Sequence, residues 1–289
     1  MRADPLDPGM ERIPFGITRL DDIVDGGVPP GSVVLLAGEA GAGSREFMYT
    51  SAVMHGLARA EHDLFDLHYG ELADEAELPD EVHVVSLSQS EPQLRDEIAA
   101  SMDPDVAEPA LEEIEFASLA HQFFHVSPVP RDWYADETRD ITSLRERHEE
   151  REGPLASLGT VLSERAPGNL VVIDSLTNLL GAIDEEDLTW SDLSYLVTGL
   201  QRAAFEWNGL ILLHVNTAAI GQSELGQLVD ACSGTMRFQW ETGGSTRART
   251  LVVQQFRGVL SRIEAEDIVQ FETELGEAGF DISDVRKIR

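Results

Sequence analysis

A strand pattern, a glycine-rich loop and a helix pattern follow one another near the start of the chain, and this order constrains the fold more than any other feature. The apolar run 32–37 is typical of a strand buried on both faces of a parallel sheet. The segment GEAGAGSR at 38–45 follows it, and 45–59 has a helical pattern. This order is the context in which a loop binds phosphate. The sequence therefore predicts a phosphate-loop α/β fold.

The loop keeps the glycine spacing of a phosphate loop but not its reactive side chains. Gly38 and Gly43 fit the glycines of G-x-x-x-x-G-K-S/T, whereas Ser44 takes the Lys position and Arg45 the Ser/Thr position. In a working loop the Lys reaches the β- and γ-phosphates and the hydroxyl ligates Mg²⁺. Arg45 lies about 100° further round the helix than the missing lysine, so it needs an unusual path to supply that charge. This is a degenerate Walker A motif.

The backbone cradle of the loop can survive these losses, because its N–H groups and the helix N-terminus attract anions. We expect ATP with Mg²⁺ to bind weakly or not at all, and no other cofactor. The alternative is an inherited turn that only joins strand to helix. The cradle residues are Gly38, Glu39, Ala40, Gly41, Ala42, Gly43, Ser44 and Arg45.

The charge of the chain is extreme, with 53 acidic and 21 basic residues, a net charge of −32, and Lys287 as its one lysine. Such self-repulsion is screened at molar salt, where the Debye length is roughly 3 Å. Because the acids are spread along the whole chain, we expect a halophilic protein; an acidic surface for cationic partners is the alternative. The arginines form no basic stripe, so nucleic-acid binding is not expected.

The remaining composition indicates a folded protein of the cytoplasm. Apolar residues make up 42% of the chain, no run of about 18 apolar residues predicts a membrane span, and the polar N-terminus lacks a signal core. A single cysteine, Cys232, excludes an internal disulfide framework.

Strand patterns alternate with helix patterns, which predicts a parallel sheet in one domain. We expect a leader at 1–12 and a single domain at 13–289, with an exposed acidic insertion at about 61–81 and a charged loop and helix at about 131–153. After the first strand, further strands are expected at 82–88, 125–127, 170–174, 209–216, 250–256 and 268–271.

Three segments together resemble the KaiC-like ATPases of the RecA superfamily. They are GITRLDDIVDGGVPPGS at 16–32, IDSLT at 173–177 and FRG at 256–258. The resemblance implies a RecA-like fold: a mainly parallel central sheet flanked by helices, with a C-terminal β-hairpin. It also implies ATP at the strand ends, often at a subunit interface in rings. Members serve in clocks, recombination, motor assembly and transcription control, so the fold does not name the process.

The resemblance also assigns a place to the catalytic carboxylate, and that place is degenerate. The family carries a glutamate pair before a Thr-Pro, and the matching residues here are Gln89 and Ser90. Glutamine can orient a water but cannot accept its proton. Glu91 is one residue off and is expected to point elsewhere. An ordinary polar strand end is the alternative.

Other family positions are partly retained. By resemblance, Asp174 holds Mg²⁺, His214 and Asn216 sense the γ-phosphate or relay to the subunit interface, and Arg257 reaches a neighbour's nucleotide. Each has a structural alternative: a helix cap for Asp174, a polar pair at a strand end for His214 and Asn216, and an ion pair with an acid for Arg257.

ATP hydrolysis needs the loop lysine, the hydroxyl that ligates Mg²⁺ and the catalytic carboxylate. All three are missing from their usual positions, so efficient hydrolysis is not expected. The chain is interpreted as a non-hydrolysing or weakly nucleotide-binding regulatory or scaffold protein in signalling or regulation. Family habit implies a protein partner, an active paralogue or self-association. The alternative is an active ATPase in signalling or in DNA repair and recombination, with a relocated catalytic site. Whether the chain is an enzyme is therefore open at this point.

Overall fold

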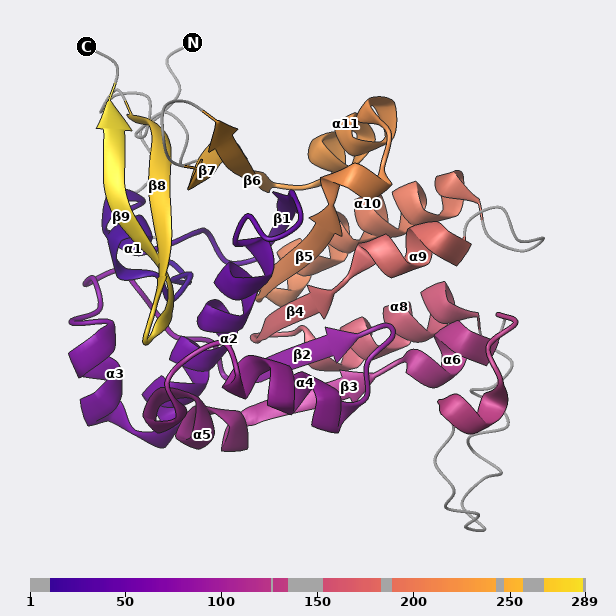
Figure 1. Cartoon of the computed structure of the whole chain (residues 1–289), viewed down its shortest axis with the longest axis horizontal. Helices are drawn as coiled ribbons and strands as arrows, with labels where there is room; N and C mark the ends of the chain where they lie inside the picture. The colour runs from indigo at the N-terminus through magenta and orange to yellow at the C-terminus, as the bar shows by residue number, and fades with distance from the viewer. Residues whose placement is uncertain are drawn as a thin grey trace.

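The computed structural model describes residues 11–125, 127–134, 153–182, 189–242, 247–256 and 268–287. Within these residues one sheet of nine strands has the order β3-β2-β4-β5-β1-β6-β7-β8-β9 (Figure 1). The strands are β1 (Ser32–Gly38), β2 (Val82–Ser86), β3 (Ile114–Ser118), β4 (Leu170–Asp174), β5 (Leu210–Asn216), β6 (Gly234–Thr242), β7 (Arg247–Phe256), β8 (Ile268–Gly276) and β9 (Gly279–Lys287).

Helices connect the parallel strands and cover both faces of their part of the sheet (Figure 1). The long helix α10 begins at a capping box formed by Thr189 and Asp192 and ends at Asn208, which adopts the left-handed conformation. The helices are α1 (Thr18–Ile23), α2 (Ser44–Ala60), α3 (His62–His68), α4 (Glu91–Ala99), α5 (Pro104–Glu112), α6 (Ala120–His125), α8 (Pro154–Arg165), α9 (Leu176–Ala182), α10 (Trp190–Trp207) and α11 (Gln222–Ala231), with short 3₁₀ turns η1 (Arg131–Trp133) and η2 (Thr217–Ala219).

Two hydrophobic cores lie on the two faces of the sheet, and successive strand residues belong to them alternately. On β1, Val34 and Leu36 pack into the core that contains α2, whereas Val33 and Leu35 pack into the core that contains α8, α10 and α11. This explains the unbroken apolar runs, because both faces of the parallel strands are covered.

The strand registers place the candidate site residues together at the carboxyl ends of the parallel strands. β3, β2, β4, β5, β1 and β6 run parallel, and Gly38 pairs with Asn216 as Ser86 pairs with Asp174. Since side chains alternate along a strand, Asp174 and His214 fall on the same face as the core residues two positions before them, which is the α2 face.

The expected α/β architecture is confirmed, with a mostly parallel sheet, flanking helices and a C-terminal hairpin of β8 and β9. The strand expected at 125–127 was wrong: His125 ends α6, and the edge strand is β3. In β3 only Ile114 is fully buried, and acidic Glu115 is exposed, so this edge strand lacks a continuous apolar run.

Two segments expected to be exposed have different outcomes. The acidic segment 61–81 contains α3, which buries Phe65, and Tyr69 is also buried. The charged segment 131–153 includes η1, but residues 135–152 lie outside the described part of the chain. In the described residues, no helix combines the length and the apolar character that a membrane crossing requires.

Candidate functional site

The glycine loop between β1 and α2 retains the tight geometry of a phosphate loop. Gly43 has φ 106°, in the left-handed region, and a Cβ there would lie 3.0 Å from the Phe280 ring. A Cβ on Gly38 would lie 2.0 Å from the Ser44 hydroxyl oxygen. Both positions therefore require glycine. The loop is a tight turn that leads directly into α2, and its role as a phosphate cradle stays a prediction.

The loop is held from outside through its carbonyl groups. The Trp240 indole Nε1 donates to the Ala40 carbonyl at 3.0 Å, and the Arg249 Nε donates to the Gly41 carbonyl at 3.0 Å. The Arg249 guanidinium also lies over the Trp240 ring. These contacts leave the N-terminus of α2, where Gly43 provides no side-chain cap, as a place where an anion can bind.

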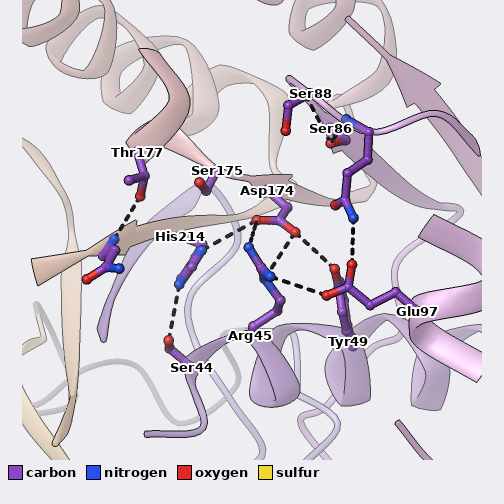
Figure 2. Close-up of polar contacts among 12 residues, drawn as sticks. Ser44, Arg45, Tyr49, Ser86, Ser88, Glu97, Asp174, Ser175, Thr177 and His214 are labelled. Atoms are coloured by element: carbon purple, nitrogen blue, oxygen red, sulfur yellow. Dashed lines mark hydrogen bonds and ion pairs between the residues drawn. The ribbon is translucent and has the colours of Figure 1, made fainter. Parts of the chain in front are cut away.

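Arg45 points to the carboxylate of Asp174 (Figure 2). Its Nη2 lies 3.3 Å from Oδ1, and its Nε lies 3.3 Å from Oδ2. The Tyr49 hydroxyl donates to Asp174 Oδ2 at 2.9 Å. The Asp174 side chain is 2% exposed, whereas that of Arg45 is 43% exposed. A fixed guanidinium therefore neutralises the acid that the resemblance assigns to Mg²⁺.

The electrostatics agree with this geometry. Burial by itself raises the pKa of the Asp174 carboxyl, but His214, the Arg45 guanidinium and the Tyr49 hydroxyl outweigh burial and hold that pKa below its usual value. Burial acts to lower the pKa of Arg45, but Asp174, Tyr49 and Glu97 together outweigh burial and raise that pKa. Both groups are therefore charged at neutral pH.

Ser44 and His214 connect the start of α2 to the same aspartate. The Ser44 hydroxyl lies 3.1 Å from His214 Nε2, and His214 Nδ1 lies 3.5 Å from Asp174 Oδ1. The order Ser–His–Asp is that of a nucleophilic triad. However, 3.5 Å is long for a hydrogen bond, and Asp174 shares its charge with Arg45. Ser44 is also only 5% exposed, so we assign the chain of contacts a structural role.

Just after β2, the side-chain amide of Gln89 contacts the carboxylate of Glu97, which lies on α4. The Gln89 Nε2 donates to Glu97 Oε2 at 2.6 Å. The Arg45 Nη1 donates to Glu97 Oε1 at 3.2 Å (Figure 2). Ser90 caps α4 in a capping box with Gln93. Glu91 pairs with Arg95 on the outside of the same helix. The structure thus separates Ser90 and Glu91 from the site and joins Gln89 to it.

Two other family positions have different surroundings. The Asn216 N–H donates to the Thr177 hydroxyl at 2.8 Å, and its side-chain Oδ1 accepts from the Ala218 N–H at 2.9 Å. Asn216 therefore caps η2. Arg257 lies outside the described residues.

The residues present do not fit Mg²⁺ in the usual way. Asp174, the carboxylate that would hold Mg²⁺, is bound by Arg45. Arg45 also occupies the position at which the Ser or Thr ligand of Mg²⁺ would stand. No cluster of three His, Cys, Asp or Glu side chains suited to a metal occurs in the described ranges. Within the loop, the Glu39 N–H donates to the Phe238 carbonyl and the Ala42 N–H donates to the Glu39 carbonyl, and Glu39 and Glu46 place negative charge beside the start of α2.

Sequence reasoning missed Tyr49 and Glu97. Tyr49 follows Arg45 by four residues, so helical spacing alone places it on the same face of α2. Glu97 lies on α4 between the buried Leu94 and Ile98, and this face of the helix was readable from the sequence. That α4 returns Glu97 to the end of β2 was not readable, because it depends on how the helix packs.

The comparisons with known proteins support the fold. No family model matches the chain, and no curated protein matches it. A KaiC-like protein from the hyperthermophilic archaeon Pyrococcus horikoshii OT3 has a similar structure, with TM-score 0.57 and 16% identity, covering 95% of this chain and 100% of that one. The flagellar accessory protein FlaH from Methanocaldococcus jannaschii is similar with TM-score 0.58 and 14% identity, covering 95% of this chain and 99% of that one. At such identities the likeness shows the fold, which is RecA-like, and not the activity.

Proposed function

We propose that this chain is a RecA-fold protein whose nucleotide site no longer hydrolyses ATP and which acts through other proteins as a regulatory or scaffold component. The contact between the Arg45 guanidinium and the Asp174 carboxylate carries the proposal. In this ion pair the protein supplies a positive charge of its own at the place where a working site binds a metal ion together with the nucleotide.

Two further features support a loss of chemistry with retention of shape. The Glu97 carboxylate is not free to accept a proton from water, because it is bound by both Gln89 and Arg45. The loop itself is still held by Trp240 and Arg249. A protein that keeps this framework without the reaction can still present its surface to a partner.

A cytoplasmic, halophilic setting completes the proposal. The acidic composition supports it, as does the near absence of lysine. By family habit the partner is an active paralogue or further copies of this chain.

Calorimetry with ATP, with and without Mg²⁺, in molar KCl tests the proposal, together with an assay of phosphate release on the same sample. We expect no phosphate release, and any nucleotide binding should be unchanged when Mg²⁺ is removed. Steady turnover, or binding that requires Mg²⁺, would show that the site is active.

The double substitution Ser44→Lys with Arg45→Thr is the matched gain-of-function variant. It restores the lysine and the hydroxyl ligand and releases Asp174 from the guanidinium. We expect it to introduce Mg²⁺-dependent ATP binding, at least about tenfold tighter than that of the unmodified chain. Ser44→Ala with Arg45→Ala is its control, because it releases Asp174 without restoring either group. If the two variants behave alike, the loop lacks more than these two side chains.

One observation favours the second candidate, an ATPase with a relocated base. Glu97 brings a carboxylate to the place where Gln89 has replaced one. If the unmodified chain does release phosphate, Glu97→Gln should abolish that release and Glu91→Gln should not, since Glu91 pairs with Arg95 away from the site.

A further inference from the structure

A hollow of about 490 Å³ lies beside the phosphate loop and is separate from the Arg45 site. We call it the Arg237 hollow; Ser44, Arg45 and Asp174 do not line it. The polar and aromatic residues that line it are Glu39, Thr217, Gln222, Arg237, Gln239 and Trp240. They come from the loop, from η2 and α11 after β5, and from β6, which lies between β1 and β7 (Figure 1).

Arg237 is the unusual member of this set. It is half-buried in β6, level with Ala37 of β1 and Val252 of β7. Within the described part of the chain, no hydrogen bond, ion pair or ring contact involves its guanidinium. By contrast, Arg45, Arg59 and Arg286 all pair with acids in the same ranges. A half-buried cation without a partner, in a chain of net charge −32, indicates that a ligand compensates it.

The other lining residues suit a small anion with a flat apolar part. Gln222 and Gln239 provide amide donors, and the half-buried Trp240 ring provides an apolar surface. Glu39 also lines the hollow, but its Oε2 accepts from the Trp240 backbone N–H at 3.3 Å, and it forms no ion pair with Arg237. A concave site with a few convergent polar groups is the usual form of a small-molecule pocket.

We propose that the Arg237 hollow binds a small organic anion in which one carboxylate or phosphate group is joined to a planar apolar group. The guanidinium pairs with the oxyanion, whose two oxygens match its fork of N–H donors, and the planar group packs against Trp240. Such a ligand would contact two residues that hold the loop: Trp240 donates to the Ala40 carbonyl, and the Thr217 hydroxyl donates to the Gly38 carbonyl at 3.3 Å. The proposal does not depend on whether the phosphate loop binds nucleotide.

Calorimetric titration of the full chain with phenyl phosphate, benzoate and benzyl alcohol, in molar KCl, tests this. We expect at least one of the two anions to bind and the neutral alcohol to bind at least about tenfold more weakly than that anion. The tighter of phenyl phosphate and benzoate identifies the oxyanion that the site prefers. Failure of both anions to bind would overturn the proposal.

Two matched pairs of variants locate the binding. Arg237→Gln should lower the affinity for the anion by at least about tenfold. Arg202→Gln, which removes an exposed arginine of α10, should change that affinity by less than about twofold. Gln222→Glu, at the exposed start of α11, adds a negative charge to the hollow without changing the sheet and should weaken anion binding several-fold. Gln227→Glu adds the same charge to the same helix outside the hollow and should leave anion binding unchanged. Anion binding that is lost in Arg45→Gln but retained in Arg237→Gln would place the anion in the phosphate loop and overturn the proposal.

Discussion

Asp21 and Asp174 are both almost fully buried, at 1% and 2% exposure, yet the protein satisfies their carboxylates in opposite ways. Asp21 accepts from the backbone N–H groups of Phe15, Gly16 and Ile17 at 2.7 to 3.1 Å and from the Tyr69 hydroxyl at 3.2 Å. The Asp174 carboxylate accepts from two side chains of α2, Arg45 and Tyr49, and His214 Nδ1 of β5 lies 3.5 Å from it. The first arrangement, which we call the backbone staple, joins Asp21 mainly to backbone groups four to six residues before it in the chain. The second, which we call the side-chain assembly, joins Asp174 to side chains of elements distant in the sequence.

The two pKa values move in opposite directions for this reason. Burial raises the pKa of the Asp21 carboxyl to about 7, although its backbone and Tyr69 hydrogen bonds act to lower it. For Asp174 burial also acts to raise the pKa, but His214 and the Arg45 cation outweigh it. Backbone dipoles thus hold a buried carboxylate in place, whereas a cation keeps it charged.

The largest expected effect is that of Asp21→Ala. Three backbone N–H groups would lose their acceptor in a buried loop, so the free energy of unfolding should fall by about 3–5 kcal/mol. Denaturant unfolding in molar KCl near pH 4, where the contribution of Asp21 to stability is present, measures this. Asp22→Ala, an exposed neighbour on the same helix, is the control and should cost less than about 0.5 kcal/mol. Equal effects of the two substitutions would show that the staple contributes little.

The pH dependence should separate the two aspartates by sign. Because the folded pKa of Asp21 is about 7 and its ordinary value is 3.8, the native state binds a proton that the unfolded state has lost between pH 4 and 7. Its contribution to stability is therefore present at low pH and is lost as pH rises to about 7, by up to about 4 kcal/mol. The contribution of Asp174 has the opposite sign: it is present above pH 3.8 and lost as pH falls through its lower folded pKa.

Unfolding free energies measured across this pH range, with Asn variants, test that difference. The buried His55, whose pKa burial lowers to about 4, contributes the opposite slope in this range, so each Asn variant is compared with the unmodified chain at every pH. The stability of the unmodified chain relative to Asp21→Asn should fall as pH rises from 4 to 7, whereas its stability relative to Asp174→Asn should not fall. A difference from Asp21→Asn that does not change with pH would contradict the prediction.

A smaller effect is expected for Asp174→Asn. The substitution loses a charged acceptor, but Arg45 is 43% exposed and can turn to water while keeping Glu97. We expect a loss of about 1–2 kcal/mol in the free energy of unfolding. Tyr49→Phe, which removes one hydrogen bond to the same carboxylate, should cost about 1 kcal/mol. A cost for Asp174→Asn as large as that of Asp21→Ala would mean that the side-chain assembly is as rigid as the backbone staple.

The smallest effect is expected for Glu97→Gln. Its ion pair with Arg45 is partly exposed on both sides, and such pairs contribute less than about 1 kcal/mol. Thermal unfolding should therefore show a small shift, since Arg45 keeps Asp174 as its main partner. A large shift would make Glu97 a structural centre of the site.

Much of the fold was readable because the parallel strands are buried on both faces. β4 and β5 are continuous apolar runs, so their positions were expected almost to the residue. β3 was misplaced because an edge strand with acidic Glu115 has no such run. The degeneracy of the glycine loop was also readable, since motif spacing is a property of the sequence itself. The partners of Arg45, Ser44 and Glu97 were not, because three strands and two helices bring them together.

The sequence by itself determined the parallel α/β fold, the glycine loop and the absence of its lysine and hydroxyl, since burial pattern and motif spacing are local along the chain. Only the tertiary structure decided that Arg45 neutralises Asp174, that Glu97 returns to the end of β2, and that Arg237 lines a hollow and has no partner among the described residues. The physical reason is that an ion pair depends on distance in space, and the pairing of β1 with β5 and of β5 with β4 brings together Arg45 and Asp174, which are 129 positions apart in the chain.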